Sequence, residues 1–257
     1  MSARAFGWRR PERALRGRTI QPTALHDAPL PAAVDLSLAF PAVYDQLPTL
    51  GSCTGQVIAA VIEYLHRKQE LQAWTPSRLA LYFDGRARAF AEAKDVGATL
   101  VDVCNGACEQ GYADEALWPY AVERFAEPPP LLYRLAAHRQ RLANFEVLAH
   151  DLPTILFELA AGNPVAVGVE VYRSFEDAPE GVVPVPGRGE LHLGGHALLL
   201  TGYDAARGTF LVRNSWGPAW GREGYGVLPY DYVLDPALCG ELVTVRAVRA
   251  DAAVPRG

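Results

Sequence analysis

The sequence predicts an α+β protein with two lobes. In the first half of the chain, apolar residues recur at helical spacing, as at Val57, Ile58 and Val61. From residue 165 onward, short β-branched or apolar runs are separated by Gly, Asn and Pro, which is typical of strands and turns. Helices followed by strands indicate an α+β fold rather than an alternating α/β fold. We place the boundary between the lobes at the triple proline of residues 128–130.

Length, composition and charge narrow the class of protein. A chain of 257 residues suits one large domain or two lobes that share an interface. Half of the residues are hydrophobic and 21% are charged, which predicts a sizeable core and argues against global disorder. The net charge of -5 argues against binding to nucleic acid or to an anionic membrane surface. The sequence has no apolar run near the roughly 20 residues that span a bilayer.

Residues 1–35 are predicted to form an N-terminal extended arm over the surface. This segment is rich in Arg and Pro and shows little periodicity. Its first 20 residues contain no apolar stretch of the kind found in secretory signals, so we expect a cytoplasmic protein.

Residues 36–127 are predicted to form a mainly helical lobe. A long buried helix is expected over residues 53–71. A second helix is expected to end near Phe90, with Thr75 as its N-cap and Pro76 at its first helical position. Residues 96–111 are interpreted as a loop-rich stretch.

Residues 128–257 are predicted to form a mainly β lobe. An amphipathic segment over residues 131–142 and a helix over residues 154–161 come first. Five strands are expected to follow, at residues 165–171, 197–202, 208–213, 225–228 and 242–248.

The four cysteines indicate a reducing environment. Cys104 and Cys108 lie four residues apart, and a disulfide, a metal pair or two free thiols would each fit that spacing. No second Cys or His pair stands at zinc-ligand spacing, so no metal site is predicted. We favour free thiols, including Cys239.

Cys53 stands where a thiol gains reactivity. It opens the predicted long helix, where unpaired N–H groups and the helix dipole favour an anion and bias a thiol toward thiolate. A lone Cys at a helix start is more often a small buried hydrophobe. Two later segments favour the functional reading, because one offers a base, His196, and the other an orienting amide, Asn214.

Four ordered sequence blocks resemble the papain-like cysteine peptidases, of the kind found in bacteria. His196 follows Cys53 by about 140 residues and Asn214 follows it by about 160, near the papain-type spacing of roughly 130 to 150. The blocks are Gln46, then Gly51-Ser52-Cys53, then Gly195-His196-Ala197, then Asn214-Ser215-Trp216-Gly217 with Trp220-Gly221 and Gly224-Tyr225.

The resemblance implies a papain-like two-lobed fold. Its left lobe would be helical, its right lobe an antiparallel, barrel-like sheet, and the active site would lie in the cleft between them. Cys53 would attack a peptide carbonyl, His196 would carry the proton and Asn214 would orient the imidazole. Gln46 would donate an N–H to the oxyanion, and Trp216 would cover the His–Asn hydrogen bond. No metal or organic cofactor is implied.

The resemblance also implies substrate contacts. Gly106 and Ala107, with Asn105 before them, are similar to the Gly-rich segment whose backbone pairs with an extended substrate. Gly195 and Trp216 are further candidate substrate contacts.

Two departures from the family pattern bear on the site. Leu50 stands where secreted relatives carry a disulfide cysteine. The loop between Gln46 and Cys53 is one residue longer than usual, so residues 47–50 must bulge if Gln46 is to reach the oxyanion.

Three functions are consistent with these residues. The leading one is a thiol peptidase that acts on a peptide or protein substrate. A transpeptidase, amidase or peptide-maturation enzyme would use the same residues, and a catalytically silent relative would only bind peptides. The arm is too short and too broken to resemble the family's inhibitory pro-segment, so we expect any restraint of activity to come from elsewhere, such as an inhibitor or regulatory protein.

Overall fold

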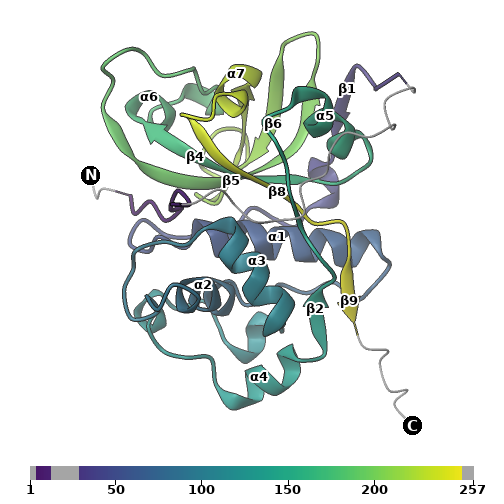
Figure 1. The fold of residues 1–257 in the computed structure, drawn as a ribbon, viewed down its shortest axis with the longest axis vertical. Coiled ribbons are helices and arrows are strands. Elements are labelled where there is room, and N and C mark those ends of the chain that lie inside the picture. Colours follow the sequence, from purple (N-terminus) through teal and green to yellow (C-terminus); the bar gives the residue numbers. More distant parts are fainter. Residues whose placement is uncertain (1–3, 13–28, 251–257) are drawn as a thin grey trace.

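The computed structural model describes residues 4–12 and 29–250 and has two lobes. Figure 1 shows helices gathered in the lower lobe and a sheet with short helices in the upper lobe. Two hydrophobic cores correspond to this division, one centred on α1 (Cys53–Lys68) and one on the sheet.

The helical lobe is built around α1. Its residues are buried from Cys53 to His66 because apolar side chains occur on every side of the helix. α2 (Arg78–Ala87) begins later than predicted. Its N-cap is Ser77, whose Oγ accepts the Ala80 N–H at 3.2 Å, so the predicted Thr75 cap is wrong.

α3 (Leu100–Glu109) lies in the stretch predicted as a loop. The Thr99 hydroxyl accepts the Asp102 N–H at 2.9 Å and donates to the Asp102 carboxylate at 2.8 Å. This reciprocal cap starts a helix despite the glycine at position 106. The loop prediction for residues 96–111 is therefore wrong.

The upper lobe contains a seven-stranded sheet in which every pairing is antiparallel. Its hydrogen-bonded order is an open path among the described strands, β3-β8-β4-β5-β6-β7, with β1 also paired to β5. The strands are β1 (Ala33–Asp35), β3 (Glu146–Val147), β4 (Val165–Tyr172), β5 (His192–Asp204), β6 (Thr209–Arg213), β7 (Tyr225–Pro229) and β8 (Cys239–Thr244). Three helices accompany them, α5 (Leu152–Ala160), α6 (Arg173–Glu176) and α7 (Tyr230–Leu234).

The boundary between the lobes differs from the predicted one at residue 128. α4 (Leu131–Ala137), β2 (Gln140–Leu142) and β9 (Val248–Ala250) lie in the lower lobe in Figure 1. Tyr133 and Leu142 are buried in the same core as α1. The triple proline does not end the helical lobe, because Pro130 is the N-cap of α4.

Residues 4–12 of the arm lie between the lobes and not over the surface, whereas β1 (Ala33–Asp35), at the other end of the predicted arm, is exposed or half-buried and pairs with β5. Residues 4–12 form the purple segment near the N label in Figure 1. Trp8 is only 4% exposed, and it forms a β-bridge with Ala98. The predicted arm also covers residues 13–28, which lie outside the described residues.

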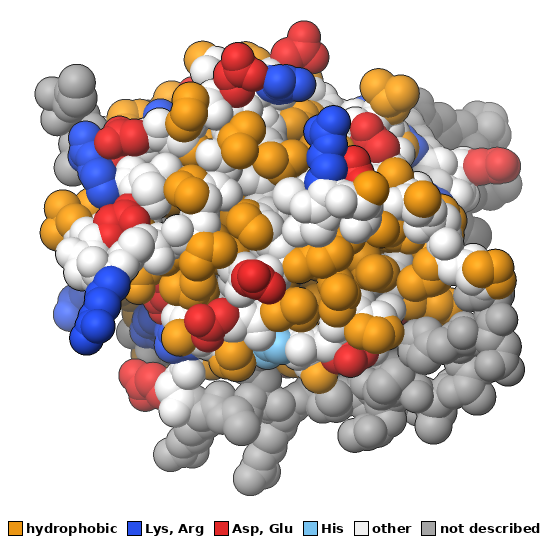
Figure 2. Space-filling model, turned by 90° about the horizontal axis from the view of Figure 1, so that it is seen from above, with side chains coloured by type: hydrophobic (Ala, Val, Ile, Leu, Met, Phe, Trp, Pro, Cys, Tyr) orange, Lys and Arg blue, Asp and Glu red, His pale blue; other side chains and the backbone are white. Residues whose placement is uncertain are grey.

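Charged side chains on the face shown in Figure 2 are scattered among apolar ones. Within the described ranges, no helix has the length and apolar character needed to cross a membrane. The same ranges contain no group of three or more His, Cys, Asp or Glu side chains arranged to hold a metal ion. The four cysteines are free thiols.

Candidate active site

Cys53 lies at the first position of α1, at the interface between the lobes. Its side chain is fully buried. The sulfur accepts the backbone N–H of Ala197, from β5, at 3.3 Å. The helix of one lobe and the sheet of the other therefore bring Cys53 beside the residue that follows His196.

His196 and Asn214 form the hydrogen bond that the sequence predicts. The distance from His196 Nε2 to Asn214 Oδ1 is 2.7 Å, and both side chains are buried. β5 pairs with β6, which ends at Arg213 and so delivers Asn214 next to the ring. Asn214 Oδ1 also accepts the Ser215 N–H at 2.8 Å, which fixes the amide. Nδ1, the other ring nitrogen, makes no hydrogen bond within the described residues.

Trp216 covers the imidazole. Its ring stacks on His196 with centroids 4.7 Å apart and planes 30° apart. Phe175 and Trp220 pack edge-on against Trp216 from behind. These aromatic rings keep water away from the His–Asn hydrogen bond, which strengthens it.

Gln46 reaches the site because the loop that follows it, residues 47–50, bulges. Leu47 has a φ of 62°, a left-handed conformation that takes up the additional residue. Gln46 Oε1 accepts the Ser215 hydroxyl at 2.8 Å, which turns the amide N–H₂ group toward the cleft. Nε2 donates to the carbonyl of Leu50 at 3.2 Å and to that of Ala5, in the arm, at 3.1 Å.

The arm lies in the cleft as an extended chain. Trp8 N–H donates to the carbonyl of Gly195 at 3.0 Å, on the β-lobe side. On the helical side, the Ala98 N–H donates to the carbonyl of Gly7 at 2.9 Å, and the Arg9 N–H donates to the carbonyl of Ala98 at 3.1 Å. Trp8 and Ala98 therefore form a parallel β-bridge, and the arm is paired with both walls of the cleft.

Burial under the arm keeps both reactive groups neutral. Burial raises the pKa of the Cys53 thiol to about 11, although N–H groups of Ala197 and Gly7 oppose the shift. Burial lowers the pKa of His196 to about 4, the hydrogen bond that its Nε2–H donates to Asn214 opposes this shift, and the positive charge of Arg4 adds to it. Near neutral pH this arrangement is therefore a thiol beside an uncharged imidazole.

A comparison with known proteins identifies the family. An uncharacterised peptidase C1-like protein of Acanthamoeba polyphaga mimivirus is 30% identical over 212 residues, which are 78% of this chain and 68% of the viral protein. The chain belongs to the papain family of cysteine proteases. The sequence profile of that family, described as papain family cysteine protease, matches residues 109–235. The chain is thus a cysteine-type peptidase and a hydrolase.

Other papain-family proteins agree with this assignment. Xylellain, a cysteine protease from Xylella fastidiosa, superposes with a TM-score of 0.88 at 28% identity and covers 96% of this chain and 98% of its own. Cysteine proteinase EP-B 1 of Hordeum vulgare is 32% identical over 141 residues, which are 51% of this chain and 35% of the plant protein. This protease therefore has the papain-like fold, and the alignment spans about a third of the plant relative's length.

Two predicted substrate contacts of this papain-family protease lie elsewhere. Gly106 and Ala107 are inside α3 and buried. A Cβ on Gly106 would lie 3.1 Å from the Cβ of Asp84, on α2, so this glycine serves helix packing. The prediction that the pair lines the cleft is wrong. Gly195 and Trp216 border the arm, and their predicted role as substrate contacts stays a prediction.

Several residues of the protease's cleft were not predicted. Gly97 and Ala98, directly before the Thr99 cap, form the edge that pairs with the arm. Glu241, in β8, accepts the Trp8 indole N–H at 2.7 Å. The available signals were weak: a glycine before a helix cap, and one acidic residue among the apolar residues of a strand.

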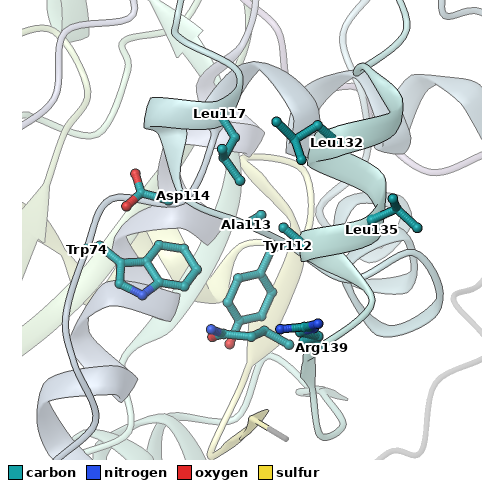
Figure 3. A pocket seen from close by; sticks show the side chains of 10 residues that line it. Trp74, Tyr112, Ala113, Asp114, Leu117, Leu132, Leu135 and Arg139 are labelled. Carbon is teal, nitrogen blue, oxygen red and sulfur yellow. The ribbon is translucent and has the colours of Figure 1, made fainter. Parts of the chain in front are cut away.

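A separate cavity of about 420 Å³ lies in the helical lobe of the protease (Figure 3). Tyr112 and Trp74 form one side, and Leu132 and Leu135 of α4 approach from the other. Cys53, His196 and Asn214 are not among its lining residues, so this cavity is distinct from the candidate active site.

Proposed function

We propose that this papain-family protease hydrolyses peptide bonds through an acyl-enzyme on Cys53. The observation that carries the proposal is the meeting of three groups at one point. The Cys53 sulfur lies at a helix N-terminus, 3.3 Å from the nitrogen of Ala197, and His196, the residue directly before Ala197, is bonded through Nε2 to Asn214.

The chemistry follows from these positions. The Cys53 thiolate attacks the carbonyl carbon, a C–S bond forms, and the imidazolium of His196 protonates the departing amine. Neutral His196 then takes a proton from water, the hydroxide attacks the thioester, and the sulfur leaves as thiolate. Asn214 keeps the ring aligned through both steps.

The developing oxyanion would be stabilised by Gln46. Its Nε2 already donates to a carbonyl oxygen of the arm, that of Ala5, at 3.1 Å, which supports a role in binding carbonyl oxygen. The backbone N–H of Cys53, at the helix N-terminus, is the second proposed donor. Substrate can enter only where the arm has left the cleft, since Cys53 is fully covered.

The test uses iodoacetamide alkylation of each cysteine, followed by peptide mapping, and turnover of a quenched fluorescent peptide. The full chain is compared with Trp8→Ala, His196→Ala and Cys53→Ala.

We expect Trp8→Ala to label at Cys53 quickly down to acid pH and to hydrolyse peptides. His196→Ala in that background should abolish both behaviours, and free glutathione in the same mixture reports ordinary thiol reactivity. Labelling of Cys53 no faster than glutathione in Trp8→Ala would contradict the proposal. Added amine nucleophiles distinguish hydrolysis from acyl transfer.

A further inference from the structure

We infer that the Trp8 side chain occupies the specificity pocket of this protease, and that Glu241 makes the pocket select a flat aromatic side chain with an N–H donor, the indole. The inference rests on the proposed function for the reaction itself. It concerns which side chain the cleft recognises beside Cys53.

Three glycines give the pocket the shape of a slot. They come from different strands or their ends, Gly168 from β4, Gly195 from β5 and Gly240 from β8. A Cβ on Gly168 would lie 2.0 Å from Cε2 of the Trp8 ring, one on Gly195 2.7 Å from Cε3, and one on Gly240 2.9 Å from Cη2. Any side chain at these positions would collide with the ring, so their absence makes room for a wide planar group.

Glu241 supplies the polar end of the slot. Its Oε2 accepts the Trp8 Nε1–H at 2.7 Å and the Leu100 N–H at 2.8 Å, and its Oε1 accepts the Val101 N–H at 2.7 Å. The first two N–H groups of α3 therefore hold the carboxylate in place and direct the remaining acceptor position of Oε2 into the slot. The side chain is 1% exposed.

A buried acceptor of this kind discriminates between ligands. An aromatic ring without a donor would leave Oε2 short of a partner inside the protein, which is unfavourable. Burial raises the pKa of Glu241 to about 7, although its three N–H donors oppose the shift. Water therefore does little to replace a missing donor at this carboxylate.

The main chain around Trp8 places the slot on the substrate path. Trp8 is bonded to Gly195 on one wall and bridged to Ala98 on the other, beside Cys53. An extended peptide that uses the same two edges will direct one side chain into the slot. Arg10 does not belong to the slot, because its guanidinium pairs with Glu170 at 2.8 Å and would leave with the arm.

The test measures how well peptides protect Cys53 from iodoacetamide in the full-length Trp8→Ala protein, whose slot is vacated. The probes are synthetic nonapeptides with the sequence of residues 4–12 and Trp, Phe or Lys at position 8. At about pH 8.5, where the Glu241 carboxylate is ionised, we expect the Trp peptide to protect with a dissociation constant about ten- to a hundredfold below that of the Phe peptide, as for a hydrogen bond to a charged group. The ratio should fall below about threefold when Glu241→Gln is added.

Two further comparisons decide the inference. Gly168→Ala in the Trp8→Ala protein keeps Glu241 and should weaken the Trp peptide at least tenfold through the clash with the ring. A preference for Lys over Trp, or equal protection by Trp and Phe, would overturn the inference. Because protection requires no turnover, a protein that binds the Trp peptide selectively but hydrolyses nothing would overturn the proposed function alone. Peptide hydrolysis without Trp selectivity would overturn only the pocket.

Discussion

The dipeptide Gly-Ala occurs at residues 97–98 and again at residues 106–107, and of the two pairs only the first is hydrogen-bonded to residues 4–12 of the arm. At Gly97, with a φ of 77°, the backbone turns and leaves the Ala98 N–H and carbonyl available to Gly7 and Arg9. The second pair lies inside α3, where helical hydrogen bonds use the backbone groups. The difference teaches that an edge for peptide binding depends on unused backbone groups and not on which small residues are present.

Removal of residues 1–12 should produce the largest effect, because it takes away the partner of the first pair. With its burial relieved and His196 free to become protonated, the pKa of Cys53 should fall from about 11 to well below the ordinary thiol value near 8.5, into the range of a thiolate–imidazolium pair. At neutral pH the alkylation rate should then rise by about a hundredfold or more. Hydrogen exchange should show lost protection at the Ala98 amide and unchanged protection at Ala107. Loss of protection at both amides would mean that the arm supports α3 and does not merely cover the cleft.

The pH dependence of alkylation should separate the covered from the uncovered site. In the full-length protein the pKa of His196 is about 4 and that of Cys53 about 11, so no imidazolium stabilises the thiolate near neutrality. The thiolate fraction, and with it the labelling rate, should rise about tenfold per pH unit between pH 6 and 9. In the arm-deleted protein the rate should stay nearly constant over that range. A flat profile for the full-length protein would show that the arm leaves the Cys–His pair charged.

Alanine at each glycine tests the comparison directly. Gly97→Ala places a Cβ 2.4 Å from the Gly7 carbonyl oxygen in a left-handed backbone, so it should displace the arm and raise Cys53 labelling about tenfold or more. In the matched variant Gly106→Ala the added Cβ meets Asp84, nearest at its Cβ at 3.1 Å, and we expect Cys53 labelling to stay within about twofold of wild type. Equal labelling of the two variants would remove the distinction between the pairs.

The smallest effect is expected at the cap that separates the two pairs. Thr99→Ala removes the hydroxyl that accepts the Asp102 N–H and should lower the free energy of unfolding by about 1 kcal/mol. Thr99→Ser should recover most of that loss. Chemical denaturation measures both changes. A Thr99→Ala protein as stable as wild type would show that packing against α1 and α2, and not the cap, fixes the start of α3.

The elements and residues that a local sequence pattern specifies could be predicted. The start of α1 at Cys53, strands β4 to β7 and the His196–Asn214 pairing follow from periodicity and from motif order. The helix α3 was predicted as a loop, because Gly106 is unfavourable in a helix and the cap at Thr99 is a short local signal. Trp8 and Glu241 meet across 233 residues of chain, a contact that no local pattern in either segment contains. The burial of the arm depends on such contacts and therefore needed the structure.

The arm that covers Cys53 belongs to the same chain as the cleft. Its local concentration at the cleft is therefore fixed by the covalent connection and does not change when the protein is diluted. Any peptide that binds in the cleft must compete with the arm. Its apparent affinity is its intrinsic affinity multiplied by the fraction of molecules whose cleft is uncovered. Dilution of the enzyme therefore does not release the arm, and a substrate displaces it only when the substrate concentration approaches its raised apparent dissociation constant.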